Sequence, residues 1–344
     1  MTTSPGSIHG SERSERNINL NEVTMISPIA PLAWSEKILR AGFELLAEKV
    51  FPKIDPGENG VVVAAVSPNN GENRGGLISR PGPGRAWSGL VGRHDATSLA
   101  LSSDNALSLR HAILIARITD DGCTIFRALD LRSGTGMFDA SGAPHRSIIA
   151  NGPLRLRLGN SALFAIPTGD LNRDGRVAAY DDVDWPAPER WLPETPPEKR
   201  IREISRVTTR SAMMSLEKEG ARQIVRGDAN SPRAGRFVVE LDGMQSEIAI
   251  DDVALRTGVL FGRYPRCDIN CGNAPMSEMI SRVHALFLMV DDSVRVFDTG
   301  STNGIGHGGR DADGLELLRD HDTRLSLGSN AAITWVPEGR LAGH

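Results

Sequence analysis

The chain is predicted to be all-β, with two β-sandwich domains, one helix before the first domain and a Pro-rich, partly helical linker between them. In the last third of the chain, Leu286 and Leu288 alternate with other residues, as strand residues do. Turn residues follow at Asp291-Asp292, and a second alternating run begins at Val294. Polar and glycine-rich clusters separate such runs, where loops meet at one end of a sandwich. A similar order of clusters occurs earlier and indicates an internal repeat.

Length and composition exclude several classes of protein. The 344 residues give room for two ordinary domains with linkers, and the net charge is −4. This mildly acidic balance, without a basic run, argues against binding to nucleic acid. No apolar stretch has the length of a membrane span and the N-terminus lacks a signal-peptide pattern, so we expect a cytoplasmic protein without membrane insertion. Cys123, Cys267 and Cys271 complete no zinc site and are expected to be free thiols.

Three clusters near the C-terminal end carry polar groups suited to an anion. They span residues 259–263, 280–284 and 298–304. Arg263 offers a rigid fork of donors for a phosphate dianion, and Arg282 adds a second positive charge. Ser281 adds a hydroxyl, and the Asn303 amide can both donate to and accept from an extended peptide backbone. Two glycines permit the tight turns that bring these groups together, Gly262 and Gly304. No nucleophile is paired with a base, so the clusters predict binding and not catalysis.

In this order and spacing, Gly-Arg, Ser-Arg-x-His and Ser-Thr-Asn-Gly resemble the motifs of the forkhead-associated (FHA) domain. The resemblance implies an eleven-strand β-sandwich whose loops bind phosphothreonine peptides, a binding mode that depends on arginine. It covers about a third of the chain, and we assign residues 236–337 to this domain. A second Asn-Gly pair that often follows in the family is replaced by His307-Gly308-Gly309, so the outer rim of the loop departs from the family pattern.

The resemblance also implies a role for each residue of the clusters. Arg263, Ser281 and Arg282 would face the phosphate. Thr302 would help to shape the pocket around the threonine, and Asn303 would bind the peptide backbone. The structural supports of the site, which would not touch the ligand, are Gly262, His284 and Gly304. The alternative is that the arginines are ordinary surface charges and that Ser-Thr-Asn-Gly is only a turn.

Residues 58–168 resemble a second, divergent copy of the same domain. Gly92-Arg93 again follows an apolar run, and Ser108 again precedes a histidine three places later. A loop at 130–136 follows the next strand-like run, as residues 298–304 do in the C-terminal domain. The order of the three clusters is therefore the same in both halves of the chain.

The copy departs from the family at two positions of the binding site. Leu109 stands where the other domain has Arg282, and Arg110 comes one place later, which on a strand sends a side chain to the opposite face. Thr135 stands in place of Asn303, so the amide is absent. We expect this domain to keep the fold, to bind phosphopeptide weakly or not at all, and to work in packing or protein contact. A retained but altered phosphate site is the alternative.

An amphipathic helix is predicted before the first sandwich. Residues 1–34 form a polar tail that is predicted to be disordered, and residues 35–57 hold the helix. Ser35 can cap its start, and Pro52 prevents its continuation. The apolar stripe consists of Leu39, Phe43, Leu46 and Val50. We favour docking of this stripe on the following domain over binding to a separate partner.

The first part of the linker, which we place at 169–235, has the spacing of a calcium loop. Three side chains with oxygen ligands occupy its first, third and fifth positions: Asp170, Asn172 and Asp174. Arg176 would supply its backbone carbonyl, and Asp181 stands at the twelfth position. The loop resembles those of dockerin-type EF-hand repeats, although Ala178 offers no ligand at position nine. The alternative is a turn rich in Asp, Asn and Gly that leaves the domain.

The rest of the linker is predicted to be stiff and then helical. Five prolines between 186 and 197 stiffen its first part, and a helix is predicted over 198–219. Thr208 and Thr209 lie between arginines, and a kinase that phosphorylates them would create a segment able to dock onto the C-terminal domain. Replacing both by valine should abolish any compaction that depends on phosphorylation.

Two functions of different classes follow. The first is a non-catalytic phosphothreonine-binding adaptor of bacterial-type Ser/Thr kinase signalling, which requires no cofactor and whose partner is a kinase or its substrate. The second is a structural or assembly protein whose sandwiches bind partners without phosphate and which calcium stabilises. An enzyme is the least favoured class, because no metal-catalytic cluster, nucleophile–base pair or Gly-rich phosphate loop is present in the sequence.

Overall fold

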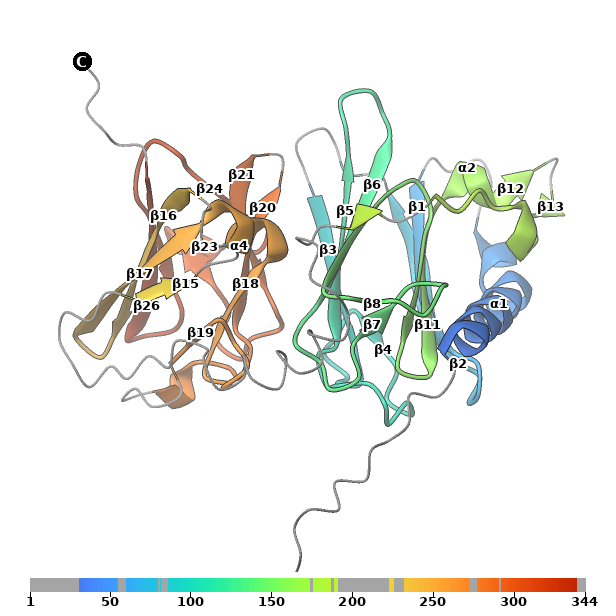
Figure 1. Cartoon of the computed structure of the whole chain (residues 1–344), viewed down its shortest axis with the longest axis horizontal. Helices are drawn as coiled ribbons and strands as arrows, with labels where there is room; N and C mark the ends of the chain where they lie inside the picture. Colours follow the sequence, from blue (N-terminus) through green and yellow to red (C-terminus); the bar gives the residue numbers. More distant parts are fainter. Residues whose placement is uncertain are drawn as a thin grey trace, which may run out of the picture.

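The computed structural model describes residues 31–54, 60–79, 81, 86–173, 176–186, 189–190, 223–225, 232–271, 277–290 and 292–338. These residues form two β-sandwiches that lie side by side, the N-terminal one drawn in blue to green and the C-terminal one in orange to red (Figure 1). The predicted all-β class is confirmed. None of the helices in these ranges is both long and apolar enough to cross a membrane.

Two antiparallel-rich sheets make the N-terminal sandwich. In spatial order, the outer sheet contains β2 (Glu72–Ser79), β1 (Gly60–Ser67), β11 (Ser161–Pro167), β10 (Leu154–Leu158), β7 (Met137–Phe138) and β8 (Pro144–His145). The inner sheet contains β14 (Glu189–Arg190), β9 (Ser147–Asn151), β6 (Thr124–Asp130), β5 (Ala112–Ile118), β3 (Ala86–Gly92) and β4 (Leu99–Ala100). Leu114, Phe126 and Leu163 are among the buried residues between these sheets.

The C-terminal sandwich has the same two-layer plan. Its outer sheet contains β15 (Gln223–Val225), β17 (Met244–Asp251), β16 (Arg233–Leu241), β26 (Ala331–Pro337), β25 (Thr323–Ser326), β22 (Gly306–His307) and β23 (Arg310–Asp311). Its inner sheet contains β19 (Ile269–Asn270), β18 (Val259–Gly262), β20 (Ala285–Val290), β21 (Ser293–Asp298) and β24 (Glu316–Leu317). Phe237 joins the two layers, because its ring centroid lies 4.3 Å from that of Phe287 and 4.9 Å from that of Trp335.

Helices and one small two-stranded sheet make up the rest of the described chain. They are α1 (Pro31–Lys49), η1 (Phe51–Lys53), α2 (Thr168–Leu171), the ladder of β12 (Asn172–Arg173) with β13 (Arg176–Val177), η2 (Tyr180–Asp182), α4 (Asp252–Thr257) and η3 (Ser277–Met279). Residues 169–190, which the sequence assigns to the linker, pack on the N-terminal sandwich where the structure describes them, since Tyr180 joins the apolar cluster of α1 and β14 pairs with β9. The predicted helix at 198–219, with Thr208 and Thr209, lies outside the described residues.

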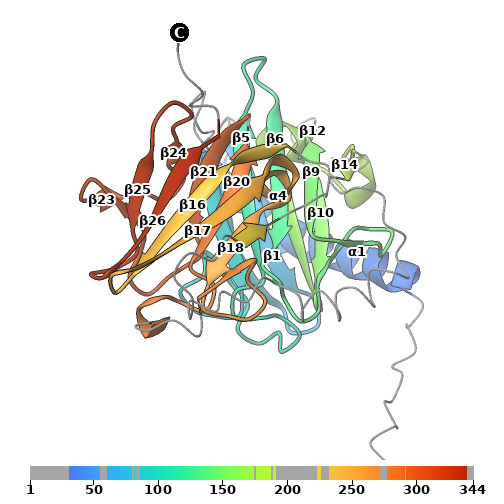
Figure 2. The same cartoon turned by 60° about the vertical axis from the view of Figure 1, so that its left-hand side comes forward.

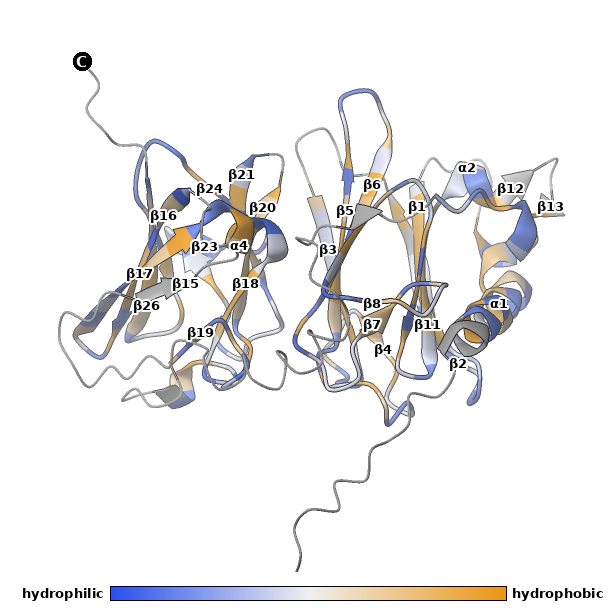
Figure 3. Ribbon diagram, in the orientation of Figure 1, coloured by the Kyte–Doolittle hydropathy of each residue, from blue (hydrophilic) through white to orange (hydrophobic). Residues whose placement is uncertain are grey.

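Helix α1 docks on the outer sheet of the N-terminal sandwich, as expected from its apolar stripe. Leu39, Phe43 and Leu46 are fully buried, and the Phe43 ring centroid lies 5.7 Å from that of Phe164 on β11. Figure 3 shows the mixed hydropathy of α1, with hydrophobic residues beside hydrophilic ones along its length. The prediction that Ser35 caps the helix is wrong, because α1 begins at Pro31, a residue favoured in the first turn. Ser35 instead lies within α1. Its side chain is buried, and its hydroxyl accepts a hydrogen bond from Arg157 Nε at 2.9 Å.

The inner sheets of the two sandwiches pack against each other. A single buried apolar cluster joins them; it includes Leu90, Ile113, Ile115, Leu129 and Leu131 from the N-terminal side and Leu260, Leu286, Leu288, Val290 and Phe297 from the C-terminal side. In the rotated view, the strands of one inner sheet pass across those of the other (Figure 2). Hydrogen bonds add to this contact, such as that from Arg127 Nη1 to the Met289 carbonyl at 3.0 Å. The two sandwiches therefore share one buried interface, and they are not separate bodies on a tether.

Candidate functional site

The loop after β18 and the loop before β20 are joined by backbone hydrogen bonds. Arg263 N donates to the Ser281 carbonyl at 3.1 Å, and Tyr264 N donates to the Arg282 carbonyl at 2.9 Å. Gly262 permits this approach, because a Cβ at that position would lie 2.4 Å from the Arg282 carbonyl oxygen. The first two sequence clusters are thus held at one end of the sandwich.

The third cluster is fastened to the second through Ser281. The Thr302 N–H donates to Ser281 Oγ at 2.9 Å, and Ser281 Oγ lies 3.4 Å from Thr302 Oγ1. Asp298, at the end of β21, shapes the turn by accepting from Ser301 N at 2.6 Å and from Ser301 Oγ at 2.9 Å. Gly304 has a φ of 70°, a left-handed conformation that favours glycine. The turn is therefore formed before any ligand binds.

His284 lies fully buried beneath both loops. Its Nδ1 accepts a hydrogen bond from Ser281 N at 3.1 Å, and its Nε2 lies 3.1 Å from the Gly304 carbonyl. Because Nδ1 accepts and Nε2 faces a carbonyl, the ring is the neutral tautomer with its proton on Nε2. Burial lowers the pKa of His284, which keeps the ring neutral. The ring of His284 therefore connects the Ser281 segment to the turn at Gly304 by hydrogen bonds.

The side chains expected to face the ligand are exposed around this framework. Arg263 and Arg282 are both exposed, and neither side chain makes a hydrogen bond or ion pair with another residue in the described ranges. Asn303 is also exposed and donates from Nδ2 to the Met279 carbonyl at 2.8 Å, which leaves its Oδ1 and one amide hydrogen for a ligand. Two uncompensated cations, one hydroxyl and one amide at the rim of three preformed loops can bind an anionic peptide.

The N-terminal sandwich repeats the hydrogen bonds that the buried histidine and the serine make in this framework. His111 is fully buried, its Nδ1 accepts from Ser108 N at 3.2 Å, and its Nε2 lies 2.9 Å from the Gly136 carbonyl. The Gly134 N–H donates to Ser108 Oγ at 3.2 Å, as the Thr302 N–H does to Ser281. Burial lowers the pKa of His111 as it does that of His284. The loops of the two sandwiches thus share one internal design.

The side chains at the rim of the N-terminal loops are different. Leu109 is 42% exposed where the C-terminal domain has a cation. Thr135 donates from its hydroxyl to the Ala106 carbonyl at 2.8 Å, which reproduces the internal bond of Asn303 but leaves no amide for a ligand. Arg93 Nη1 donates to Asn105 Oδ1 at 3.4 Å. Arg110 points away from these loops and into the C-terminal sandwich, consistent with its predicted shift of one position.

The residues of the predicted calcium loop are only partly described. Asp170 is partly buried in α2, while Asp174 falls outside the described residues, as do the side chains of Asn172 and Arg176. The Asp181 carboxylate accepts two hydrogen bonds from the terminal nitrogens of Arg40, at 2.7 and 2.8 Å. This interaction lowers the pKa of Asp181. No group of three His, Cys, Asp or Glu side chains suited to a metal occurs within the described ranges. Calcium binding stays a prediction, for which Asp181 would have to leave Arg40.

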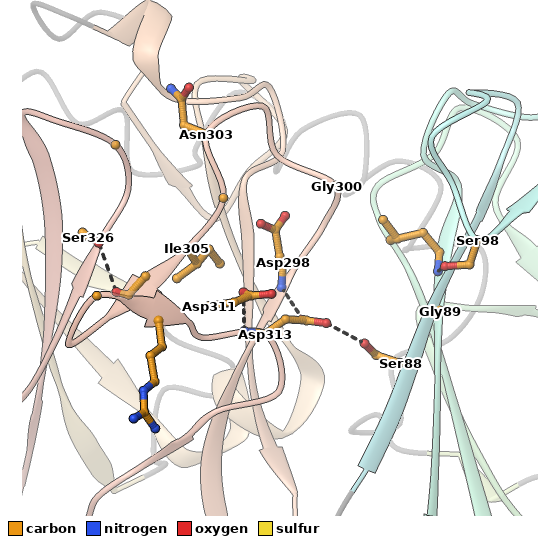
Figure 4. A pocket seen from close by; sticks show the side chains of 16 residues that line it. Ser88, Gly89, Ser98, Asp298, Gly300, Asn303, Ile305, Asp311, Asp313 and Ser326 are labelled. Atoms are coloured by element: carbon orange, nitrogen blue, oxygen red, sulfur yellow. Dashed lines mark hydrogen bonds between the residues drawn. The ribbon is translucent and has the colours of Figure 1, made fainter. Parts of the chain in front are cut away.

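A groove of about 660 Å³ runs from Asn303 into the space between the sandwiches. Figure 4 shows Asp298, Asp311 and Asp313 along it, with Ser88 and Ser98 of the N-terminal sandwich on the opposite side. Ser88 Oγ donates to Asp313 Oδ2 at 3.3 Å across the groove. Sequence patterns did not indicate Ser88, Ser98, Asp311 or Asp313, and the two serines become neighbours of the aspartates only when the two sandwiches pack together.

Comparisons with known proteins identify the C-terminal sandwich. Residues 259–328 match the family model named FHA domain. No curated protein matches the chain. Three solved structures are similar to part of this chain. The Slr1951 protein of Synechocystis sp. is 21% identical over 29% of this chain and 95% of that chain, with a TM-score of 0.24. The corresponding values are 19%, 30%, 97% and 0.23 for FHA-1 of Rv1747 from Mycobacterium tuberculosis, and 18%, 36%, 84% and 0.26 for the yeast Dun1 FHA domain in complex with a doubly phosphorylated peptide. These likenesses are too low to indicate a ligand for this chain.

The family match covers all three loops that carry the polar clusters. It also covers β18, β20 and β21, the strands of the inner sheet that position those loops. The chain therefore contains an FHA domain, matched over residues 259–328, as the C-terminal of its two β-sandwiches.

Proposed function

We propose that the chain is a non-catalytic adaptor whose FHA domain binds phosphothreonine peptides. The observation that carries the proposal is the pair of exposed, unpaired cations among the described residues, Arg263 and Arg282, beside a loop already ordered by Ser281 and His284. A phosphate dianion would neutralise both cations through charge-assisted hydrogen bonds. Little ordering is required on binding, because the turn from Asp298 to Gly304 is held in place by its own hydrogen bonds.

Ser281 and Asn303 would complete the recognition. Ser281 Oγ accepts from Thr302 N, and its own hydrogen is directed only to the distant Thr302 Oγ1 at 3.4 Å, so that hydrogen is available to a phosphate oxygen. Asn303 has one amide hydrogen and Oδ1 available for the backbone of an extended peptide. Thr302, exposed between them, would contact the threonine of the ligand. The ligand would be a protein phosphorylated on threonine, such as a Ser/Thr kinase or its substrate.

The decisive test is calorimetric titration of the full chain with a degenerate phosphothreonine peptide pool. The phosphorylated pool should bind, and the unphosphorylated pool should not. Arg263→Ala removes a charge-assisted contact of a few kcal/mol and should weaken binding on the order of a hundredfold. Arg319→Ala is the matched control, because Arg319 is an exposed arginine of the same domain for which the structure gives no contact with the three loops. Equal binding of both pools, or no effect of Arg263→Ala, would contradict the proposal.

A second candidate is favoured by the interface between the sandwiches. There, one sandwich binds the other through an apolar sheet face and without a phosphate. A structural or assembly protein would use such faces for its partners, and calcium would stabilise it if the loop at 170–181 binds the ion. The titration separates the two candidates, because a partner bound in this way would be indifferent to Arg263→Ala.

A further inference from the structure

Arg110 belongs to the N-terminal sandwich, but its guanidinium bonds to the C-terminal one. Its Nη1 donates to the Val283 carbonyl at 3.2 Å, and its Nη2 donates to the Gly300 carbonyl. The side chain is half-buried. Both acceptors are backbone carbonyls, which a single planar fork of donors can bridge at once.

These two carbonyls come from the two loops that carry the ligand-facing residues. Val283 directly follows Arg282 and belongs to the segment of Ser281 and His284. Gly300 comes two residues before Thr302, within the turn that presents Asn303. One guanidinium therefore ties the second and third clusters of the site to each other from behind. Any movement of the third cluster away from the second would have to break a bond to Arg110.

The surroundings of Gly300 show how closely the N-terminal sandwich lies against this turn. A Cβ placed on Gly300 would lie 3.1 Å from Leu90 Cδ1 and 3.3 Å from Arg110 Nε. Gly300 also has a φ of 73°, so it can adopt this turn without strain and bring its carbonyl to Arg110. The back of the phosphate-facing turn is thus covered by the other domain.

The charge of Arg110 matters as well as its shape. Partial burial lowers the pKa of Arg110, the neighbouring Asp298 raises it and the neighbouring Arg282 lowers it. An arginine stays protonated under such shifts, whereas the charge of a lysine is less secure when buried. Arg110 therefore adds a positive charge close to Arg282, and Asp298 partly balances it.

We propose that Arg110 is a positioning residue of the phosphopeptide site, through which the N-terminal sandwich holds the FHA loops in their binding geometry. This inference rests on the proposed function. It gives the N-terminal sandwich a role in ligand binding that does not require it to bind phosphate itself. Leu109 stands where the C-terminal domain has Arg282. The next residue, Arg110, orders the loops of the C-terminal sandwich instead.

The test compares Arg110→Lys with Arg127→Lys in the full chain. Arg127 is a matched control, because it also donates across the interface to two backbone carbonyls, those of Met289 and Arg256, and neither belongs to the loops of the site. Lysine retains a basic nitrogen at both positions but cannot bridge two carbonyls as a guanidinium does. Two measurements are made on each variant: the Kd for the phosphothreonine pool, and amide hydrogen exchange over residues 298–304 without ligand.

We expect Arg110→Lys to weaken phosphopeptide binding about tenfold and to speed exchange in residues 298–304, while Arg127→Lys changes neither. Wild-type affinity in Arg110→Lys would overturn the inference, because charge alone would then suffice. Equal losses in both variants would also overturn it, since the effect would be one of general interface stability. If the wild-type chain binds no phosphopeptide, the proposed function fails, and the exchange measurement alone decides whether Arg110 orders the loop.

Discussion

At the scale of single residues, the protonation state of His284 makes the stability of the FHA domain depend on pH. The ring is fully buried, and its Nδ1 must stay unprotonated to accept the Ser281 N–H. Burial lowers its pKa below the ordinary value of 6.5. His111 has the same bonds in the N-terminal sandwich, and burial lowers its pKa too. Each domain therefore holds a neutral histidine under its loops.

This arrangement predicts that stability is lost in mild acid. Between the folded pKa and 6.5, the unfolded chain binds more protons at His284 than the folded chain does. The contribution of the neutral ring is therefore complete above pH of about 6.5 and is lost as the pH falls below it, by on the order of 1 kcal/mol per histidine. Urea unfolding from neutral pH to about 5.5 measures the loss. His284→Asn should reduce this pH dependence, because it removes the buried group that takes up the proton. A pH-independent stability would refute the interpretation.

At the scale of elements, α1 is part of the N-terminal sandwich. Phe43 lies at its centre, with ring centroids at 5.3 Å from Phe51, 5.6 Å from Tyr180 and 6.0 Å from Trp185. Gly42 brings the helix close to the sheet, because a Cβ there would lie 2.8 Å from that of Ala162. The helix, the sheet and the segment after β11 thus share one apolar cluster.

Phe43→Ala should destabilise the chain by about 3–5 kcal/mol, because it leaves a cavity among aromatic rings that cannot collapse fully. Glu44→Ala, at the neighbouring exposed position of the same helix, should change stability by less than about 0.5 kcal/mol. Urea unfolding monitored by tryptophan fluorescence gives both values. If Phe43→Ala were as mild as Glu44→Ala, the helix would be only loosely associated with the sheet.

The nearly continuous apolar sequences of β5 and β20 indicate burial on both faces, which the alternation of residues alone did not reveal. All six residues of β20 are buried, since Phe287 faces its own core while Leu286 and Leu288 face the other sandwich. Nearly continuous apolar runs are typical of strands covered on both faces. The sequence predicted these strands. It did not predict that their second face packs against the other sandwich, because no local pattern of residues specifies that partner.

At the scale of the whole molecule, the apolar interface predicts that the two sandwiches unfold together. Leu288 is fully buried in the cluster that joins them. Leu288→Asp places an unpaired carboxylate there, which costs several kcal/mol unless the domains separate. Calorimetry should show one transition for the wild-type chain and two for Leu288→Asp. Leu318→Asp, at a side chain 44% exposed, should keep a single transition. Two transitions in the wild-type chain would contradict this prediction.

The sequence by itself determined the β class, the docked helix and the order of the three polar clusters. Each of these depends on short-range rules: the two-residue period of strands, the helical stripe around Phe43, and glycines such as Gly262 where the backbone must approach closely. The motif spacing also indicated that Arg110 leaves its own site.

Only the tertiary structure decided which groups the Arg110 side chain binds. Its acceptors, the carbonyls of Val283 and Gly300, are 173 and 190 residues away along the chain and carry no side-chain signature. The groove beside Asn303 is likewise formed by residues of both sandwiches. Such neighbours depend on how two finished surfaces fit, which is set by apolar area and hydrogen bonds summed over the whole interface and not by any local pattern of residues.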